Sequence, residues 1–194
     1  MTTVASVLNK ATGGRVTPAA VTWTGFVMHV PIALLIANGQ LVWAAILLVV
    51  FGLFDALDGA LARLQNSASV KGMLLDASTD RMKEVLLYAG VAYYFAVHGY
   101  DAFSFALVVI ALGASMSVSY VKAKGEAAVA SGGKKIPHAK LNRMFADGVL
   151  TFEMRMTVLI LGLLTDLLVV AVAVIAVLAT YTAFQRLIRI SRSL

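Results

Sequence analysis

Long runs of apolar residues constrain the fold of this chain more than any other sequence feature. Residues 18–37 contain no Asp, Glu, Lys or Arg, and residues 41–54, 102–121 and 167–185 share this property. Three of these runs reach about the 20 residues that a helix needs to cross the hydrocarbon core of a membrane. Charged residues make up only 13% of the chain, against about 25% in soluble domains. We therefore predict an all-α integral membrane protein.

The apolar runs and the turn signals between them predict six transmembrane helices. These spans are expected at about 18–37, 41–63, 72–97, 103–121, 142–164 and 167–187. Thr17 is expected to cap the first span, with Pro18 in its first turn. The chain is predicted to form a single domain with three parts: an amphipathic juxtamembrane helix within 1–16, a six-helix bundle at 17–188 and a basic tail at 189–194.

The third and fifth spans are expected to carry charged residues, because their purely apolar parts are too short to cross a membrane. Residues 85–97 and 156–164 reach the required length only if the helices begin near Gly72 and Asn142. These starts draw several charged residues into the spans: Asp76, Asp80, Arg81, Lys83, Glu84, Asp147, Glu153 and Arg155. Such groups must face a water-filled cavity or a partner subunit. A basic polar loop is expected at 122–140.

The distribution of basic residues predicts the topology. All sixteen Lys and Arg residues lie in the N-terminal segment, in 63–83, in 122–155 or in the C-terminal tail, and none lies near residues 38, 99 or 165. Because cytoplasmic loops are enriched in Lys and Arg, both termini are expected in the cytoplasm. The net charge of +6 is thus explained by topology rather than by nucleic acid binding. The chain has no cysteine, which excludes disulfides and thiolate chemistry.

Four aspartates stand at helical spacing between residues 55 and 80, in the pattern D-x2-D-G-x2-A-R-x8-G-x3-D-x3-D. Asp55 and Asp58 are three residues apart and Asp76 and Asp80 four apart, so each pair shares one helix face. Carboxylates this close repel one another unless a cation joins them. Oxygen ligands favour hard cations such as Mg²⁺ or Mn²⁺.

The other fixed positions of the pattern suit a phosphate-bearing ligand. Gly59 and Ala62 leave one helix face without bulk, so that a ligand can approach the backbone. Arg63 offers a planar guanidinium that matches phosphate geometry. Gly72 opens the next helix without a side chain.

This pattern resembles the signature of the CDP-alcohol phosphotransferase (phosphatidyltransferase) family of membrane enzymes. The resemblance implies transfer of a phosphatidyl group from CDP-diacylglycerol to an alcohol, with release of CMP. It implies two Mg²⁺ or Mn²⁺ ions shared by Asp55, Asp58 and Asp76. It makes Asp80 the general base and a possible further metal ligand. A nucleotide site is implied at Gly59, Ala62, Arg63 and Gly72, and the family also suggests a homodimer, to which small residues such as Gly90 are suited.

Three segments resemble the branch of the family that uses inositol phosphate, the phosphatidylinositol-phosphate synthases. They are Asp80-Arg81, the run 119–126 and the run 152–155. In the run 119–126, Lys124 and Gly125 stand where this branch is expected to have Arg and Ala, and the spacing from Glu153 to Arg155 is short. The expected acceptor contacts are Arg81, Lys122, Lys124 and Arg155. A buried Arg is costly unless it pairs with an acid or an anion, which favours a phosphorylated polyol as acceptor.

Three alternatives remain open at this point. The acceptor could be glycerol 3-phosphate, which would make a phosphatidylglycerophosphate synthase, or an uncharged alcohol such as serine, which would leave a basic cavity unexplained. The third alternative is a divalent-cation transporter, since intramembrane carboxylates also mark ion pathways. All four aspartates lie towards one membrane face, however, and a transporter gives the Gly, Ala and Arg positions no role. We expect a multi-pass protein of the cell membrane whose active site opens to the cytoplasm.

Overall fold

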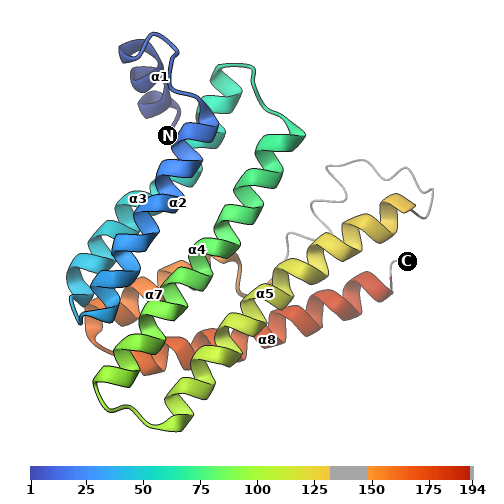
Figure 1. The fold of residues 1–194 in the computed structure, drawn as a ribbon. Helices are drawn as coiled ribbons and strands as arrows, with labels where there is room; N and C mark the ends of the chain where they lie inside the picture. Colours follow the sequence, from blue (N-terminus) through green and yellow to red (C-terminus); the bar gives the residue numbers. More distant parts are fainter. Residues whose placement is uncertain (132–147, 193–194) are drawn as a thin grey trace. The chain divides into compact units, whose positions relative to one another are not determined.

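The computed structural model describes residues 1–131 and 148–192, and every regular element in these ranges is a helix (Figure 1). The predicted all-α class is therefore confirmed. The chain forms two compact units, Met1–His98 and Gly99–Leu194. Each unit has its own helix packing, described separately below.

The first unit contains α1 (Thr2–Ala11), α2 (Pro18–Ala37), α3 (Leu41–Leu64) and α4 (Val70–Val97). Helix α2 packs against both α3 and α4, and α1 packs against α3 (Figure 1). The apolar core of this unit is made of fully buried side chains: Ile32, Ile36, Ala44, Leu61, Leu87, Val91 and Phe95. The predicted helix within the N-terminal segment is thus present as α1.

Short polar side chains cap the starts of α2 and α4. Thr17 Oγ1 accepts a hydrogen bond from Ala20 N at 3.2 Å, and Pro18 occupies the first turn of α2. This confirms the predicted cap. Ser69 Oγ likewise accepts from Gly72 N at 3.1 Å at the start of α4. Helix α4 begins at Val70, so the prediction that it starts near Gly72 and includes the charged residues is confirmed.

The second unit contains α5 (Ala102–Ser131), α7 (Phe152–Thr165) and α8 (Leu168–Ser191). Helix α8 packs against α5 and α7. Before α5, the Asp101 carboxylate accepts hydrogen bonds from the Ser104 amide at 3.0 Å and the Ser104 hydroxyl at 2.7 Å. These two donors lower the pKa of Asp101 from its ordinary value. The turn between α7 and α8 contains Asp166 in the left-handed region, at φ 57°.

Four helices of the described part of the chain are long and apolar enough to cross a membrane: α2, α3, α5 and α8. Helix α4 has 28 residues but carries the charged groups of the signature, and α7 has only 14 residues. The six-span bundle and the cytoplasmic termini therefore stay predictions.

Two predicted boundaries are wrong. Residues 122–131 continue α5 as helix instead of forming a loop. This stretch is rich in Ala, Lys and Glu, which favour helix, and Lys122 pairs with Glu126 one turn later at 3.9 Å. Residues 132–140 of the predicted loop lie outside the described residues.

The predicted fifth helix does not run on continuously from near Asn142. Residues 148–151 are not helical, and α7 begins at Phe152. Here the chain lies against α8: Leu150 N donates to Thr182 Oγ1 at 3.1 Å. A Cβ added at Gly148 would lie 2.6 Å from Thr182 Cγ2. This close approach explains the break. Asn142 itself lies outside the described residues.

Gly90 allows α4 to approach α2, and its replacement should destabilise the first unit. A Cβ at this position would lie 2.6 Å from the Ala33 carbonyl oxygen, which is backbone and cannot rotate away. We expect Gly90→Ala to lower the free energy of unfolding by about 1–3 kcal/mol, the usual cost of overpacking. Thermal unfolding of the full chain in detergent would measure this. The matched control is Gly52→Ala in α3, where a Cβ meets no atom within 4 Å; equal stability of both variants would contradict the prediction.

Candidate metal and nucleotide site

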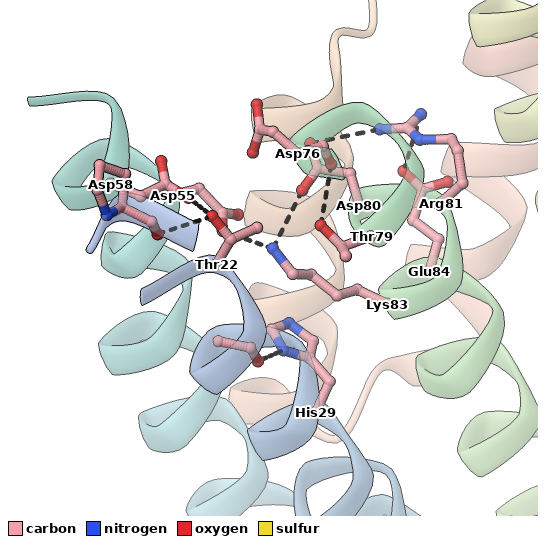
Figure 2. Close-up of polar contacts among 12 residues, drawn as sticks. Thr22, His29, Asp55, Asp58, Asp76, Thr79, Asp80, Arg81, Lys83 and Glu84 are labelled. Atoms are coloured by element: carbon pink, nitrogen blue, oxygen red, sulfur yellow. Dashed lines mark hydrogen bonds and ion pairs between the residues drawn. The ribbon is translucent and has the colours of Figure 1, made fainter. Parts of the chain in front are cut away.

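The four aspartates of the signature all lie in the first unit, two near the end of α3 and two in the first half of α4 (Figure 2). Asp58 is 6% exposed, and its Oδ2 accepts a hydrogen bond of 2.5 Å from the Thr22 hydroxyl of α2. Because α2 packs against both α3 and α4, it brings the two pairs to a common place. Each pair therefore lies on one helix face, as its spacing in the sequence predicts.

Three of the aspartates come close enough to hold one ion. Asp55, Asp76 and Asp80 each offer a carboxylate oxygen, and these oxygens lie within 4.8 Å of one another. Asp58 lies outside this group of three, although it lines the same cleft as Asp76. Of the predicted metal ligands, the structure thus gathers three closely and places the fourth in the lining of an adjoining cleft.

The donor set fits a divalent metal ion. Asp76 Oδ1 is buried and accepts no hydrogen bond from the residues that the structure describes, although a buried polar atom without a partner is costly. The three grouped carboxylates supply only oxygen atoms, which suit Mg²⁺ or Mn²⁺. An ion held here would satisfy the free oxygen of Asp76 and reduce the repulsion between the carboxylates.

Lys83 of α4 reaches the same cluster. Its Nζ lies 2.5 Å from Asp55 Oδ1 and 3.1 Å from Asp80 Oδ1, and the side chain is 0% exposed (Figure 2). Asp80 also faces Arg81, whose Nη2 lies 4.0 Å from Asp80 Oδ2, while Arg81 Nη1 lies 3.7 Å from Glu84 Oε1. The two aspartates of α4 therefore have different surroundings: Asp80 has basic neighbours, whereas one oxygen of Asp76 has no hydrogen-bond partner among the described residues.

A cleft of about 530 Å³ adjoins the aspartates. Its lining includes all four residues that the sequence assigned to the nucleotide, namely Gly59, Ala62, Arg63 and Gly72. It also includes Asp58, Asp76 and the polar connection at Gln65, Ser67 and Ser69. Gly59 lies next to the Arg63 side chain, since a Cβ there would be in ordinary contact with Arg63 Nη1 at 3.6 Å. The lining of the cleft thus combines basic, small and acidic residues, the last supplying two carboxylates.

The predicted acceptor contacts fall in both units. Arg81 belongs to the first unit beside Asp80, as described above. In the second unit, Arg155 is 1% exposed; its Nη1 donates to the Leu150 carbonyl at 3.3 Å, and its guanidinium lies over the Phe152 ring at 5.9 Å. Lys122 pairs with Glu126, and Lys124 lies over the Tyr120 ring at 5.7 Å. The burial of Arg155 agrees with the expectation that it lies inside the protein.

Sequence reasoning gave no role to three residues at the cluster. Thr22 and His29 lie on α2, outside the signature; His29 is buried, and its Nδ1 lies 2.7 Å from the Gly25 carbonyl, which it can contact only as a donor (Figure 2). Lys83 was expected to face a water-filled cavity or a partner subunit, and no residue was named as its partner. Its distance of three residues from Asp80 was a visible signal, whereas its contact with Asp55 depends on the packing of the helices.

Comparison with known proteins identifies the relatives of this chain. A family model described as CDP-alcohol phosphatidyltransferase matches residues 15–181. The phosphatidylinositol phosphate synthase of Corynebacterium glutamicum is 41% identical over 117 residues, which is 58% of this chain but only 52% of that protein. The chain thus spans about half the length of this relative. The synthase of Mycolicibacterium smegmatis is 33% identical over 191 residues, covering 93% of this chain and 80% of that protein.

Solved structures agree with the sequence comparison. The crystal structure of Mycobacterium tuberculosis phosphatidylinositol phosphate synthase with CDP-DAG bound is 29% identical, covers 97% of this chain and 92% of its own, and has a TM-score of 0.81. A second structure of that protein, in complex with manganese and citrate, has the same identity and TM-score and covers 98% of this chain and 88% of its own.

Proposed function

The chain belongs to the CDP-alcohol phosphatidyltransferase family, and we propose that it transfers a phosphatidyl group from CDP-diacylglycerol to inositol phosphate. The products are phosphatidylinositol phosphate and CMP. The choice of acceptor rests on the named activity of the relatives, and the donor on the CDP-DAG bound to the M. tuberculosis protein. The reaction requires a membrane setting because the donor is a lipid, and α2, α3, α5 and α8 have the length and composition for one.

The observation that carries this proposal is that the cluster of three aspartates lies directly beside the cleft. Asp55, Asp76 and Asp80 meet within 4.8 Å, and Asp76 also lines the cleft that holds Gly59, Ala62, Arg63 and Gly72. A pyrophosphate bound there by Arg63 would lie beside the carboxylate group, with the nucleotide against the small residues. A divalent-cation transporter would use the carboxylates but not the cleft.

In the proposed reaction, the acceptor hydroxyl attacks the phosphorus that carries the diacylglycerol. A new P–O bond forms to the acceptor oxygen, while the bond from that phosphorus to the bridging oxygen of CMP breaks. Asp80 takes the hydroxyl proton, and Arg81 holds the carboxylate of Asp80 in place from 4.0 Å. Divalent ions held by Asp55, Asp58, Asp76 and Asp80 would supply positive charge opposite the pyrophosphate. The proposal keeps the four contacts that the sequence assigns to the phosphate of the acceptor, namely Arg81, Lys122, Lys124 and Arg155.

The proposal extends to the metal ions, to the orientation of the chain in the membrane and to the oligomeric state. We infer dependence on two Mg²⁺ or Mn²⁺ ions, supported by the fit of the donor set and by the manganese complex of the M. tuberculosis protein. The positive-inside distribution of Lys and Arg supports six spans in the cell membrane with the site open to the cytoplasm. A homodimer remains part of the proposal, although Gly90, one of the small residues considered for it, packs against Ala33 of its own chain.

The proposed function predicts which acceptor releases CMP. Purified full-length protein with CDP-diacylglycerol and Mg²⁺ should release CMP with inositol phosphate and at least tenfold more slowly with inositol, glycerol 3-phosphate or serine. Inositol and serine lack the phosphate for which the site has buried groups, and glycerol 3-phosphate lacks the ring hydroxyls of inositol. A site built to bind such groups rejects a substrate without them. CMP is measured by chromatography, and protein in EDTA is the control. Faster release with glycerol 3-phosphate would keep the reaction and overturn the acceptor.

A further inference from the structure

Lys83 places a positive charge within the cluster of Asp55, Asp76 and Asp80. Its ammonium contacts Asp55 of α3 and Asp80 of its own helix (Figure 2), at 2.5 Å and 3.1 Å. No part of the side chain is exposed. These two aspartates are also two of the three that lie within 4.8 Å of one another. Lys83 therefore competes for the same oxygen atoms that a divalent ion would use.

We propose that Lys83 is a resident counter-cation of the aspartate cluster: it holds Asp55 and Asp80 together before a divalent ion arrives, and it weakens the binding of that ion. The inference rests on the proposed metal-dependent function. It assigns Lys83 a positioning role, since the side chain acts through the carboxylates and not on the substrate.

The charges of the cluster support this role. The Lys83 ammonium contacts two carboxylates, Asp55 and Asp80, and the third carboxylate of the cluster is Asp76. One positive charge therefore leaves an excess of negative charge that a divalent ion can still neutralise. Without Lys83, Asp55 and Asp80 would face each other with only water between them, and like charges at this distance repel strongly. With Lys83, the cluster is assembled before metal binds, but an incoming cation meets a like charge at two of its ligands.

The alternative is that Lys83 merely stabilises the fold, and the two roles predict opposite results for metal binding. A lysine that only supports the packing of α3 against α4 would, when removed, loosen the carboxylates and weaken the binding of metal. A resident counter-cation would, when removed, free two ligands and strengthen it. Lysine suits the second role because its long flexible stem lets the ammonium move aside.

The test measures Mn²⁺ binding directly, by electron paramagnetic resonance of the purified full-length protein in detergent. We expect Lys83→Met, which keeps the volume and removes the charge, to bind Mn²⁺ about tenfold more tightly or better. Lys83→Arg, which keeps the charge, should bind as the original protein does. Lys10→Met is the matched control, because Lys10 is exposed at the end of α1, and its affinity should not change.

Thermal unfolding gives a second readout on the same proteins. In EDTA, Lys83→Met should unfold at a lower temperature than the original protein, and the rise in its Tm on adding Mn²⁺ should be larger. If this variant can be purified only with Mn²⁺ present, that dependence is the expected result in its extreme form. If it does not fold at all, Lys83→Gln replaces it, and tighter Mn²⁺ binding is expected there too.

The outcomes separate this inference from the function on which it rests. An affinity of the neutral variants equal to or below that of the original protein would overturn the role of Lys83. This holds provided that Asp76→Asn abolishes Mn²⁺ binding and so places the ion at the cluster. If Asp76→Asn binds Mn²⁺ as tightly as the original protein does, the ion binds elsewhere. The metal site and the role of Lys83 then fail together.

Discussion

Asp80→Asn is expected to lower the rate of CMP release by about 10²–10⁴-fold, the usual contribution of a general base. An amide has nearly the same shape as a carboxylate but does not take up the hydroxyl proton. Its carbonyl oxygen can still accept a hydrogen bond from Lys83, which lies 3.1 Å from the present Oδ1. Asp80 is outside the lining of the cleft, and Asp55, Asp58 and Asp76 are unchanged, so binding of CDP-diacylglycerol should fall far less than turnover. The two measurements are CMP release with inositol phosphate and equilibrium binding of the CDP-lipid.

The control for this variant is Asp166→Asn, the same chemical change in the turn between α7 and α8. Asp166 is exposed and has a left-handed backbone, which asparagine also adopts readily. CMP release should be unchanged in this control. If Asp80→Asn kept a rate within a few-fold of the original protein, Asp80 would not be the base.

The elements that the sequence predicts well are those in which composition and local signals agree. Helix α2 follows an uncharged run that ends in the turn before Leu41, and Thr17 with Pro18 marks its start. Helix α3 begins with the uncharged run 41–54 and continues through the first aspartate pair to Leu64. The start of α4 could be predicted from membrane thickness, because the apolar part alone is too short. The spacing of the aspartates was enough to place each pair on one helix face.

The features that the sequence did not predict depend on contacts between distant segments. The break before Phe152 arises where Gly148 and Leu150 lie against Thr182, which is more than thirty residues later in the chain. The contact of Lys83 with Asp55 spans two helices in the same way. The continuation of α5 beyond Val121 was missed for a different reason: its charged residues indicated a loop, but Lys and Glu are also good helix formers.

Asp76→Asn should separate metal binding from stability. Asp76 Oδ1 is buried, with no hydrogen-bond partner in the described ranges 1–131 and 148–192, and the residue lies beside Asp55 and Asp80. Removing its charge should relieve repulsion in the metal-free protein, so the Tm in EDTA is expected to stay the same or to rise. Mn²⁺ affinity should fall about a hundredfold or more, because one oxygen ligand and one formal charge are lost. The rise of Tm on adding Mn²⁺ should disappear with it.

This result would differ in kind from that of Asp80→Asn. Asp76 belongs both to the carboxylate group and to the lining of the cleft, so Asp76→Asn should weaken CDP-diacylglycerol binding and turnover together, the latter by about a thousandfold or more. Mn²⁺ titration by paramagnetic resonance, thermal unfolding with and without EDTA, and CMP release measure the three effects on one preparation, with Asp166→Asn again as control. Mn²⁺ affinity equal to that of the original protein would remove Asp76 from the ligands. A lower Tm in EDTA would show that its carboxylate stabilises the fold, and the free oxygen would then need another explanation than a metal ion.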